Sequence, residues 1–430
     1  MDGLNVLVLH NLGRPELSPA FLLNHVFALQ RNFPVHRYLY HDAALPLPAY
    51  VAEVEFDAII LDVSFLCARW AGDEFFENRK RAYSFVRDSS AVKLAFPQDE
   101  YDCHILLDEW MCDWKVDVVF SVISSGWDVL YPKYHEFGDI RLGYTGYVDE
   151  SLLDRWRKPF AQRRIDIGYR ARKLPPYFGR VGENKWTIGR DVAIAAAKFG
   201  IKADIALGDA GTLLGEDWLE FINDSKFTLG ASSGSSLLDP RGDIQRDVRA
   251  FARKHPDASF GEVEAHCFPG MDGKHMFTAI SPRVLEAALL DSCQILVDGD
   301  YSGIVKPWEH FIPLRSDASN FDEVHSAMRD PELVSRMILQ CREAVLSVDD
   351  LRYKNKATKI LDLIGDLKTR KNVVSSPAAI DNVLGRYRDE MDEKYRTLWR
   401  RQRLRRKLVS SLEGYPWLLD VLRKTKRLVT

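Results

Sequence analysis

Short apolar segments of strand length alternate with helical segments along most of this sequence, and this alternation limits the possible folds more than any other feature. The strand-like segments of the first series are Asn5–His10, Val35–Tyr40, Asp57–Val63, Val92–Phe96 and Asp117–Val122. Those of the second series are Ile165–Tyr169, Ala203–Leu207, Lys226–Gly230 and Gln294–Val297. Strands that alternate with helices form parallel sheets with right-handed crossovers. We therefore expect an α/β protein of two doubly wound, Rossmann-like domains that face each other across a cleft.

A polar segment between the two series divides the 430 residues. We predict a first domain over residues 1–150, a linker over 151–164, a second domain over 165–368 and a helical tail over 369–430. A chain of this length usually forms about two or three domains. Ligands of doubly wound domains bind beyond the carboxyl ends of the strands, so the cleft is the expected binding site.

The tail differs from the rest of the chain in charge. The whole chain has a net charge of −3, whereas residues 394–430 carry 12 basic and two acidic side chains. Beside these cations, one face of the predicted helix contains four apolar residues, Trp417, Leu418, Val421 and Leu422. This pattern is typical of a helix that lies on an anionic membrane surface; the alternative is a helix packed on the body or on a partner chain. Because the body is acidic, nucleic acid is not an expected partner.

The sequence lacks features that several protein classes require. No apolar run approaches the roughly 20 residues that span a bilayer, and no basic region precedes an apolar stretch at the N-terminus. We therefore expect a cytoplasmic protein. The six cysteines include no Cys-x-x-Cys pair, which argues against zinc. Neither a complete phosphate-binding loop nor a dinucleotide-binding glycine motif is present, which disfavours simple ATPases and NAD-dependent dehydrogenases.

Residues 280–303 combine features of a nucleotide-diphosphate site. A helix is predicted to begin at Ser281-Pro282, and its free N–H groups and dipole favour an anion. Arg283 lies in the first turn, where its guanidinium can bind phosphate oxygens. Glu286, one turn later, can accept hydrogen bonds from ribose hydroxyls. A loop after the next strand supplies further donor-binding candidates: Tyr301, Ser302 and Gly303. The alternative is an ordinary helix with a surface arginine.

The second domain offers other candidates for donor binding. Arg170 follows the first strand of this domain and Lys185 lies in the next loop, so both are placed to neutralise a diphosphate. Another turn offers N–H and O–H donors, from Ser233, Gly234 and Ser235. The alternatives are solvated surface cations and a plain flexible loop. Asp298 and Asp300 form an Asp-x-Asp pattern that can bind a divalent cation, but we interpret it as a strand end entering a turn and predict no metal.

Three motifs carry a family resemblance: Ser281-Pro-Arg-(x2)-Glu286-Ala-Ala, Gln294-Ile-Leu-(x3)-Asp300-Tyr-Ser-Gly303-Ile and His310-Phe-Ile-Pro-Leu314. They resemble the C-terminal donor domain of GT-B glycosyltransferases. The likeness is greatest to a bacterial branch of surface-polysaccharide enzymes and more distant to the spore-coat-type glycosyltransferases. It covers roughly residues 165–364, while the N-terminal half matches in architecture.

The resemblance implies a nucleotide-diphosphate-sugar donor of the UDP or GDP type and no required cofactor. Glu286 matches the second carboxylate of the Glu-x7-Glu motif of retaining enzymes, which holds the ribose. The position of the first carboxylate is Thr278, so the sequence departs there from the retaining pattern.

The first domain is expected to bind the acceptor. Asp99 and Glu100 directly follow a strand, where one of them could act as the general base that deprotonates an acceptor hydroxyl. The alternative is that Asp99 caps the helix that follows. His10 and Gly13, at the end of the first strand, are further acceptor-side candidates, although a histidine there is more often structural.

The sequence therefore predicts a glycosyltransferase that moves a sugar from a nucleotide-diphosphate-sugar donor to a hydroxyl of a glycan or lipid-linked acceptor in surface polysaccharide synthesis. It would be cytoplasmic, and peripheral at the inner face of the cytoplasmic membrane if the tail binds anionic lipid. Two alternatives remain: a nucleotide-sugar epimerase with the same fold, and a non-catalytic glycan-assembly protein.

Overall fold

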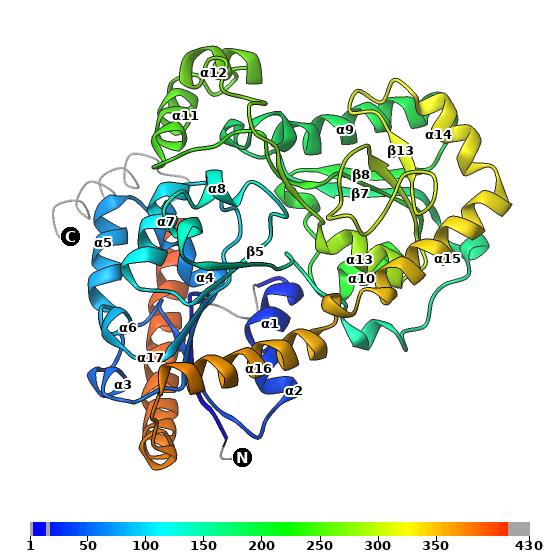
Figure 1. The fold of residues 1–430 in the computed structure, drawn as a ribbon. Helices are drawn as coiled ribbons and strands as arrows, with labels where there is room; N and C mark the ends of the chain where they lie inside the picture. The colour runs from blue at the N-terminus through cyan, green and yellow to red at the C-terminus, as the bar shows by residue number, and fades with distance from the viewer. Residues whose placement is uncertain (1–2, 14–17, 412–430) are drawn as a thin grey trace.

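The computed structural model describes residues 3–13 and 18–411. The first domain contains a six-stranded parallel sheet, whose strands in spatial order are β2 (Arg37–Asp42), β1 (Asn5–His10), β3 (Ala58–Leu61), β4 (Val92–Ala95), β5 (Val118–Ser121) and β6 (Asp139–Leu142). Every residue of β1 is buried, because helices cover both faces of the sheet. Figure 1 shows this sheet in the lower half of the molecule.

The second domain contains a five-stranded parallel sheet, whose strands in spatial order are β13 (Ile312–Leu314), β12 (Cys293–Val297), β9 (Ser225–Gly230), β7 (Ile165–Ala171) and β8 (Ala203–Leu207). In both sheets the first strand lies between the second and the third, so the chain reverses direction across the sheet there. This reversal is the switch point at which doubly wound domains bind ligands. The prediction of two doubly wound domains is confirmed.

The helices of the first 150 residues are α1 (Ala20–Val26), α2 (Ala28–Asn32), α3 (Ala49–Ala52), α4 (Val63–Leu66), α5 (Asp73–Ala82), α6 (Phe85–Asp88), α7 (His104–Asp113) and α8 (Trp127–Leu130). Those around the second sheet are α9 (Gly179–Lys198), α10 (Glu216–Asn223), α13 (Pro282–Leu289), α14 (Phe321–Met328) and α15 (Pro331–Ser347). An insertion between β9 and α13 contains the antiparallel pair β10 (Ser233–Ser235) and β11 (Phe277–Ala279), with α11 (Asp243–Lys254) and α12 (Phe260–Cys267).

The last two described helices, α16 (Tyr353–Lys371) and α17 (Pro377–Ser411), return to the first domain. Ala357, Ile360 and Ile364 of α16 join the core on one face of the first sheet. The two chain connections between the domains lie side by side, because the Val148 N–H donates to the Leu351 carbonyl at 2.7 Å. The structure therefore differs from the predicted boundary at residue 368: the second domain ends near residue 350.

The predicted linker over 151–164 also differs from the structure at its end. Arg163 is buried, and its guanidinium donates to the carbonyls of Ser225 and Leu290 at 2.9 and 2.8 Å. Both carbonyls belong to the second domain, so residue 163 is part of that domain's packing rather than of a solvated connection.

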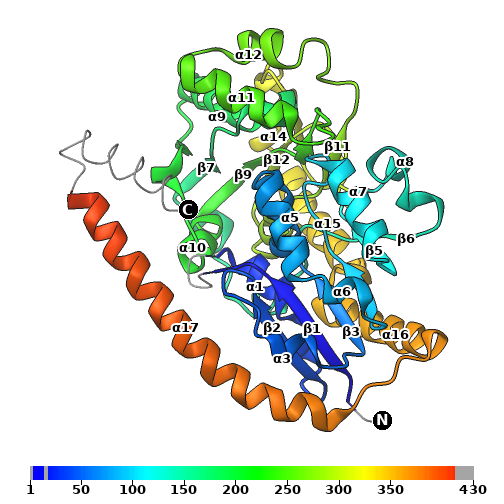
Figure 2. The same ribbon diagram turned by 90° about the vertical axis from the view of Figure 1, so that its left-hand side faces the viewer.

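Helix α17 runs along the first domain and covers the other face of its sheet (Figure 2). Its buried side chains are Ile380, Tyr387 and Met391, and further apolar residues up to Leu398 pack on the same core. From Ile380 to Leu398 the tail therefore packs on the body of the protein, which is the alternative given above for a membrane-bound helix. The predicted membrane-binding face over 417–422 lies outside the described residues. Among the helices that the structure describes, none is long and apolar enough to cross a bilayer.

Replacing Ile380 by alanine is expected to lower the free energy of unfolding by about 2–5 kcal/mol, the range for removing a buried isoleucine side chain. Ile380 is completely buried between α17 and the first sheet. Urea unfolding of the full chain measures the change. Val374→Ala is the control, because Val374 is 77% exposed and should change stability by less than about 0.5 kcal/mol. Equal effects of the two substitutions would contradict the packing of α17.

Candidate functional site

The two domains meet at the carboxyl ends of their strands, in a region that we call the domain junction. It consists of the loop 97–103 after β4, the beginning of α9 and the first turn of α13. The Asp239 N–H of the insertion donates to the Tyr101 carbonyl at 3.0 Å. The rings of Tyr101 and Phe178 meet edge to face at 6.2 Å. Beside them, the Thr145 hydroxyl donates to the Ile280 carbonyl just before α13.

Three of the predicted residues come together at the domain junction. Asp99, from the first domain, interacts electrostatically with Lys185 of α9, and Lys185 also interacts with Arg283 of α13. Burial, opposed by Asp99 and aided by Arg283, lowers the pKa of Lys185 to about 8. The structure gives the Lys185 ammonium no hydrogen bond or ion pair within the described ranges. A lysine in this state is suited to bind an anion.

The neighbouring side chains hold Asp99 and Arg283 in place. Asp99 has a left-handed backbone conformation, with φ of 47°, and its carboxylate accepts a hydrogen bond of 2.5 Å from the Tyr101 hydroxyl. The exposed Arg283 donates to the Arg170 carbonyl at 2.5 Å, and its guanidinium lies 5.1 Å from the centre of the Trp218 ring. The Lys185 ammonium thus interacts with one carboxylate of the first domain and one guanidinium of the second.

Glu286 lies one turn beyond Arg283 on α13. Its Oε2 accepts a hydrogen bond of 2.7 Å from the Trp218 indole N–H. Burial raises the pKa of Glu286 to about 7, and the nearby Asp149 acts in the same direction. The second carboxylate oxygen has no protein donor among the described residues, so it can accept from a ligand.

No family model and no curated protein matches this sequence. Solved structures do match the fold. An alpha-glucosyltransferase in complex with UDP-glucose and DNA containing an abasic site aligns at 12% identity over 84% of this chain and 100% of that one, with a TM-score of 0.50. A glycosyltransferase from Rickettsia africae ESF-5 aligns at 9% identity over 85% of this chain and 99% of that one, also with a TM-score of 0.50.

The chain has the GT-B fold. Its two doubly wound domains together align with these two structures over more than four fifths of this chain. In this GT-B fold the domain junction lies at the ligand-binding edge of both sheets.

The predicted role of Glu100 as a general base is not supported by the structure. Its side chain is completely buried and accepts hydrogen bonds from the Tyr131 hydroxyl at 2.7 Å and the Val122 N–H at 3.0 Å. Burial raises the pKa of Glu100 to about 7. This carboxyl group holds the end of β5 inside the first domain and cannot reach an acceptor.

Arg170 is also turned away from the domain junction. Its guanidinium donates to the carbonyl and carboxylate of Asp204 on β8, and it lies 3.9 Å from the centre of the Phe221 ring. These partners bind both terminal nitrogens of the guanidinium, and its Nε is buried, so the predicted role is not supported. Its carbonyl, which positions Arg283, is the atom that contributes to the site.

The serine-rich turn forms a strand instead of a flexible loop. Ser235 is completely buried and its hydroxyl donates to the carbonyls of Phe178 and Leu237. Gly234 has φ of 136°, and a Cβ there would lie 1.9 Å from the Phe277 carbonyl oxygen. Ser233 pairs with Ala279 in the same ladder. Donor binding by these three residues is therefore not supported; they join the insertion to β11.

The loop after β12 is also mainly structural. Tyr301 is completely buried and donates to the Val297 carbonyl at 2.6 Å, which argues against its predicted contact with a donor. The Ser302 hydroxyl accepts from the Ile280 N–H at 3.1 Å, and so supports the approach to α13. Gly303 is exposed, and its N–H donates to Asp300 at 3.0 Å. No group of three or more potential metal ligands occurs among the residues that the structure describes.

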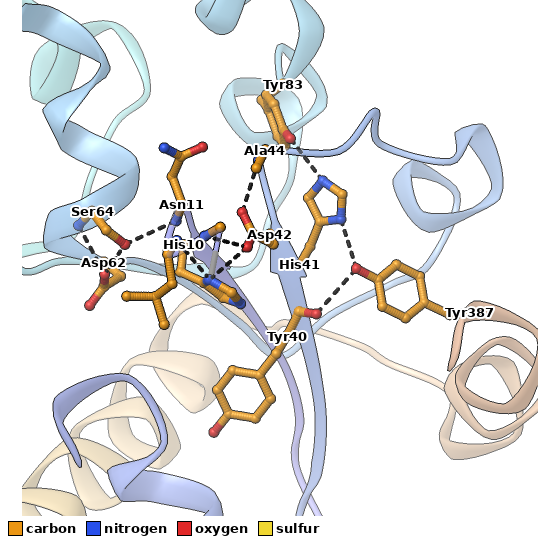
Figure 3. A network of polar contacts seen from close by, with 12 residues as sticks. His10, Asn11, Tyr40, His41, Asp42, Ala44, Asp62, Ser64, Tyr83 and Tyr387 are labelled. Carbon is orange, nitrogen blue, oxygen red and sulfur yellow. Dashed lines mark hydrogen bonds and ion pairs between the residues drawn. The ribbon is translucent and has the colours of Figure 1, made fainter. Parts of the chain in front are cut away.

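The predicted acceptor-side residue His10 ends β1 and belongs to a polar network with Asp42 (Figure 3). The Gly13 N–H donates to Asp42 at 2.7 Å, and His10 Nδ1 lies 4.0 Å from the same carboxylate. Burial lowers the pKa of His10. The adjacent His41 links this edge to α17, because its two ring nitrogens contact the hydroxyls of Tyr387 and Tyr83 at 2.7 and 2.8 Å. His10 and Gly13 therefore order the strand ends.

Sequence reasoning missed four buried residues of the first domain: His25, Asp62, Arg69 and Lys356. Asp62 directly follows β3, and this is the same signal that singled out Asp99 after β4. The other three lie in helices without a motif. Their role follows from contacts between segments far apart in the chain.

Proposed function

We propose that this protein transfers a sugar from a nucleoside-diphosphate sugar to a hydroxyl group. The observation that carries the proposal is the Lys185 ammonium at the domain junction, which interacts electrostatically with Arg283 and Asp99 and has no hydrogen bond or ion pair within residues 3–13 and 18–411. Two cations at the ligand-binding edge of the second domain suit a diphosphate that gains negative charge as the sugar leaves. The glucosyltransferase neighbour holds UDP-glucose, which supports UDP as the first nucleotide to test.

In this mechanism the bond between the sugar and the diphosphate breaks through an oxocarbenium-like state. Lys185 and Arg283 stabilise the departing diphosphate, and Glu286 accepts hydrogen bonds from the ribose. The first turn of α13 adds N–H groups, since the Ser281 side chain makes no capping hydrogen bond. A reaction of this kind uses charge and dipoles already in place and needs no metal at the phosphate.

The finer assignment rests on the sequence resemblance. It gives a UDP- or GDP-linked hexose as donor, a glycan or lipid-linked acceptor in surface polysaccharide synthesis, and a place at the cytoplasmic side of the membrane. The tail over 394–430 would supply the membrane contact. Helix α17 uses its apolar face against the first domain up to Leu398, so this contact would come from the residues beyond.

Binding and turnover of nucleotide sugars test the proposal. Calorimetry with UDP and GDP identifies the nucleotide, and incubation of the full chain with the matching sugar donor and a panel of alkyl glycosides reveals transfer by mass spectrometry. A glycosylated product supports the proposal. Conversion of the donor sugar without an acceptor would identify an epimerase, and folded protein that binds neither nucleotide would favour a non-catalytic protein.

Replacing Glu286 by alanine is expected to weaken UDP binding by about 10- to 100-fold, since a hydrogen bond to a charged group contributes roughly 1.5–3 kcal/mol. Calorimetry measures the dissociation constant. Glu216→Ala is the matched control, because Glu216 is exposed on α10 and pairs with Arg155. Unchanged affinity in Glu286→Ala would remove the ribose contact from the mechanism.

A further inference from the structure

The insertion of the second domain, residues 233–279, reaches across to the first domain. It lies between β9 and α13 and carries α11 and α12. Figure 1 shows these two helices above α7 and α8 of the first domain on one side of the domain junction, whereas α15 leads into α16 on the other side. The two domains are therefore joined on both sides: by the chain connections at Val148 and Leu351, and by the insertion.

Main-chain hydrogen bonds join the insertion to the loop before α7. The Asp239 N–H donates to the Tyr101 carbonyl at 3.0 Å, and the Asp239 carbonyl accepts from the His104 N–H at 3.3 Å. Through these two bonds Asp239 pairs with Asp102 as residues do in a parallel sheet. A short strand-like contact therefore crosses the boundary between the two domains.

Helix α7 begins on this contact. Its N-cap residue, Cys103, has φ of 54° and makes no side-chain hydrogen bond to the helix. The His104 N–H donates to the insertion instead, and the Ile105 N–H donates to the Pro240 carbonyl at 3.0 Å. The first N–H groups of a helix have no acceptor inside the helix. Moving the insertion away would therefore take the protein acceptors from both of these groups.

An apolar contact accompanies these hydrogen bonds. Phe277 and Ala279 of β11 are 4% and 3% exposed, and both belong to the hydrophobic core of the first domain. The Phe277 ring lies against the backbone just before α8, since a Cβ on Gly126 would be 3.2 Å from it. The core of one domain thus contains side chains of the other, and water would reach them if the domains separated here.

The segment of the insertion that makes the contact is itself fixed. The Asp239 carboxylate accepts from the N–H groups of Gly242 and Gln245 at 2.8 and 2.9 Å, and so holds the start of α11. At the rim, Arg241 donates to Glu109 of α7 at 2.8 Å. Their side chains are 49% and 34% exposed, so this ion pair contributes little. The buried contacts hold the insertion on the first domain.

The contact continues into the domain junction. Tyr101, whose carbonyl accepts from the insertion, donates through its hydroxyl to the Asp99 carboxylate at 2.5 Å. Asp99 in turn interacts electrostatically with Lys185 of the second domain. The insertion therefore holds the loop on which Asp99 lies.

We propose that residues 233–279 form a clasp that fixes the angle between the two domains and positions the loop of Asp99. Domains that share only a small polar interface usually move relative to each other. Here, rotation about the connections at Val148 and Leu351 would break the main-chain bonds to α7 and expose Phe277 at the same time. The chain therefore binds its ligands without opening the junction on this side. This inference goes beyond the proposed function and holds for whichever nucleotide binds.

Hydrogen exchange of the full-length protein tests the clasp directly. The amides of His104 and Ile105 donate to the insertion, so they exchange when the clasp opens or the domain unfolds. Mass spectrometry with fragmentation reads single amides. We expect both to exchange within about tenfold of the rate of Met111, a buried residue inside α7, with and without UDP. Faster exchange than this, or a larger change on addition of UDP, would overturn the inference.

Two substitutions weaken the clasp in different ways. Phe277→Ala is expected to raise the exchange rate of the two amides by about a hundredfold, since it removes a buried phenyl ring; Phe137→Ala, at a position that is 69% exposed, is the control. Arg241→Glu places two acids together at the rim and should raise the rate severalfold even if Phe277→Ala does not fold. Its control is Arg253→Glu, at an exposed position of α11. Unchanged exchange in Arg241→Glu and in folded Phe277→Ala would overturn the inference.

The positioning of Asp99 has a readout of its own. Phe277→Ala should lower kcat of sugar transfer by about a hundredfold, the effect of a small misplacement at a reacting site, and leave the dissociation constant of UDP within about twofold. UDP affinity should persist because Lys185, Arg283 and Glu286 all belong to the second domain. Loss of UDP affinity with kcat unchanged would overturn the positioning role. Absence of nucleotide binding in the wild-type protein would end the proposed function, while the exchange rates still decide the clasp.

Discussion

Lys185→Met is expected to lower the rate of sugar transfer by about a hundred- to a thousandfold, the usual effect of removing one donor that stabilises charge in a transition state. The Lys185 side chain is half-buried at the domain junction, interacts electrostatically with Asp99 and Arg283, and has no hydrogen bond or ion pair among the residues that the structure describes. Its charge is therefore available to the leaving diphosphate. Steady-state kinetics with the donor identified by calorimetry measures the change. Lys198→Met, an exposed position at the end of the same helix, is the control and should keep the wild-type rate.

The pH profile gives an independent check on Lys185. Its pKa is lowered to about 8, so the ammonium loses its charge above this pH, whereas an ordinary lysine stays charged to about pH 10. We expect kcat/KM to fall above pH 8 in the wild-type protein, since this quantity reports the free enzyme. In Lys185→Met the residual rate should lack this limb. A wild-type rate that stays constant up to pH 10 would contradict the role of Lys185.

Arg69→Met is expected to destabilise the first domain by about 3–5 kcal/mol, the range for breaking a buried charged network. Arg69 is 1% exposed and its guanidinium donates to four carbonyls, those of Leu66, Gln98, Asp99 and Asp102. Three of these belong to the loop that carries Asp99. Methionine fills part of the volume but removes a donor from all four carbonyls, of which those of Asp99 and Asp102 keep the Asp102 N–H and the Trp70 indole N–H as donors.

Urea unfolding followed by tryptophan fluorescence measures this change, because Trp110 and Trp114 are buried in the same core. Arg87→Met is the control, since Arg87 is exposed and pairs with its neighbour Asp88. Lysine at position 69 should recover only part of the loss, because an ammonium cannot reproduce the guanidinium fork. Equal stability of Arg69→Met and the wild-type protein would show that the loop does not depend on Arg69.

The sequence predicts a residue's place along a strand better than the direction of its side chain. Asp99, Lys185 and Arg283 all lie near carboxyl ends of strands or starts of helices, and a parallel sheet brings such positions to one edge. Glu100 lies directly beside Asp99 in sequence, yet it points into the core and Asp99 points to the domain junction. Arg170 and Tyr301 fail for the same reason, because the burial that turns them inward depends on Phe221 and on the core around α13.

Some residues come together only because α16 returns to the first domain, and no local sequence pattern predicts their contacts. Lys356 lies in an unremarkable amphipathic helix, and nothing near it in sequence indicates that α16 crosses back to β1 and β3. The prediction of a domain boundary at residue 368 has the same origin, since the helical pattern of α16 is the same on either domain. Local sequence patterns indicate parallel strands and helix starts. The domain on which a helix packs depends instead on the apolar surface with which it makes contact, and this surface comes from distant parts of the chain.

The return of α16 and α17 means that the first domain is made of two pieces of chain, separated by the whole second domain. On the ribosome, the second domain emerges complete while the first still lacks the helices that cover parts of both faces of its sheet. During synthesis the N-terminal domain usually folds first. Here the order of folding is reversed, because the second domain is complete before the first. The second domain can finish folding as one uninterrupted segment, and the first must keep its exposed strands from aggregating until α16 and α17 have emerged.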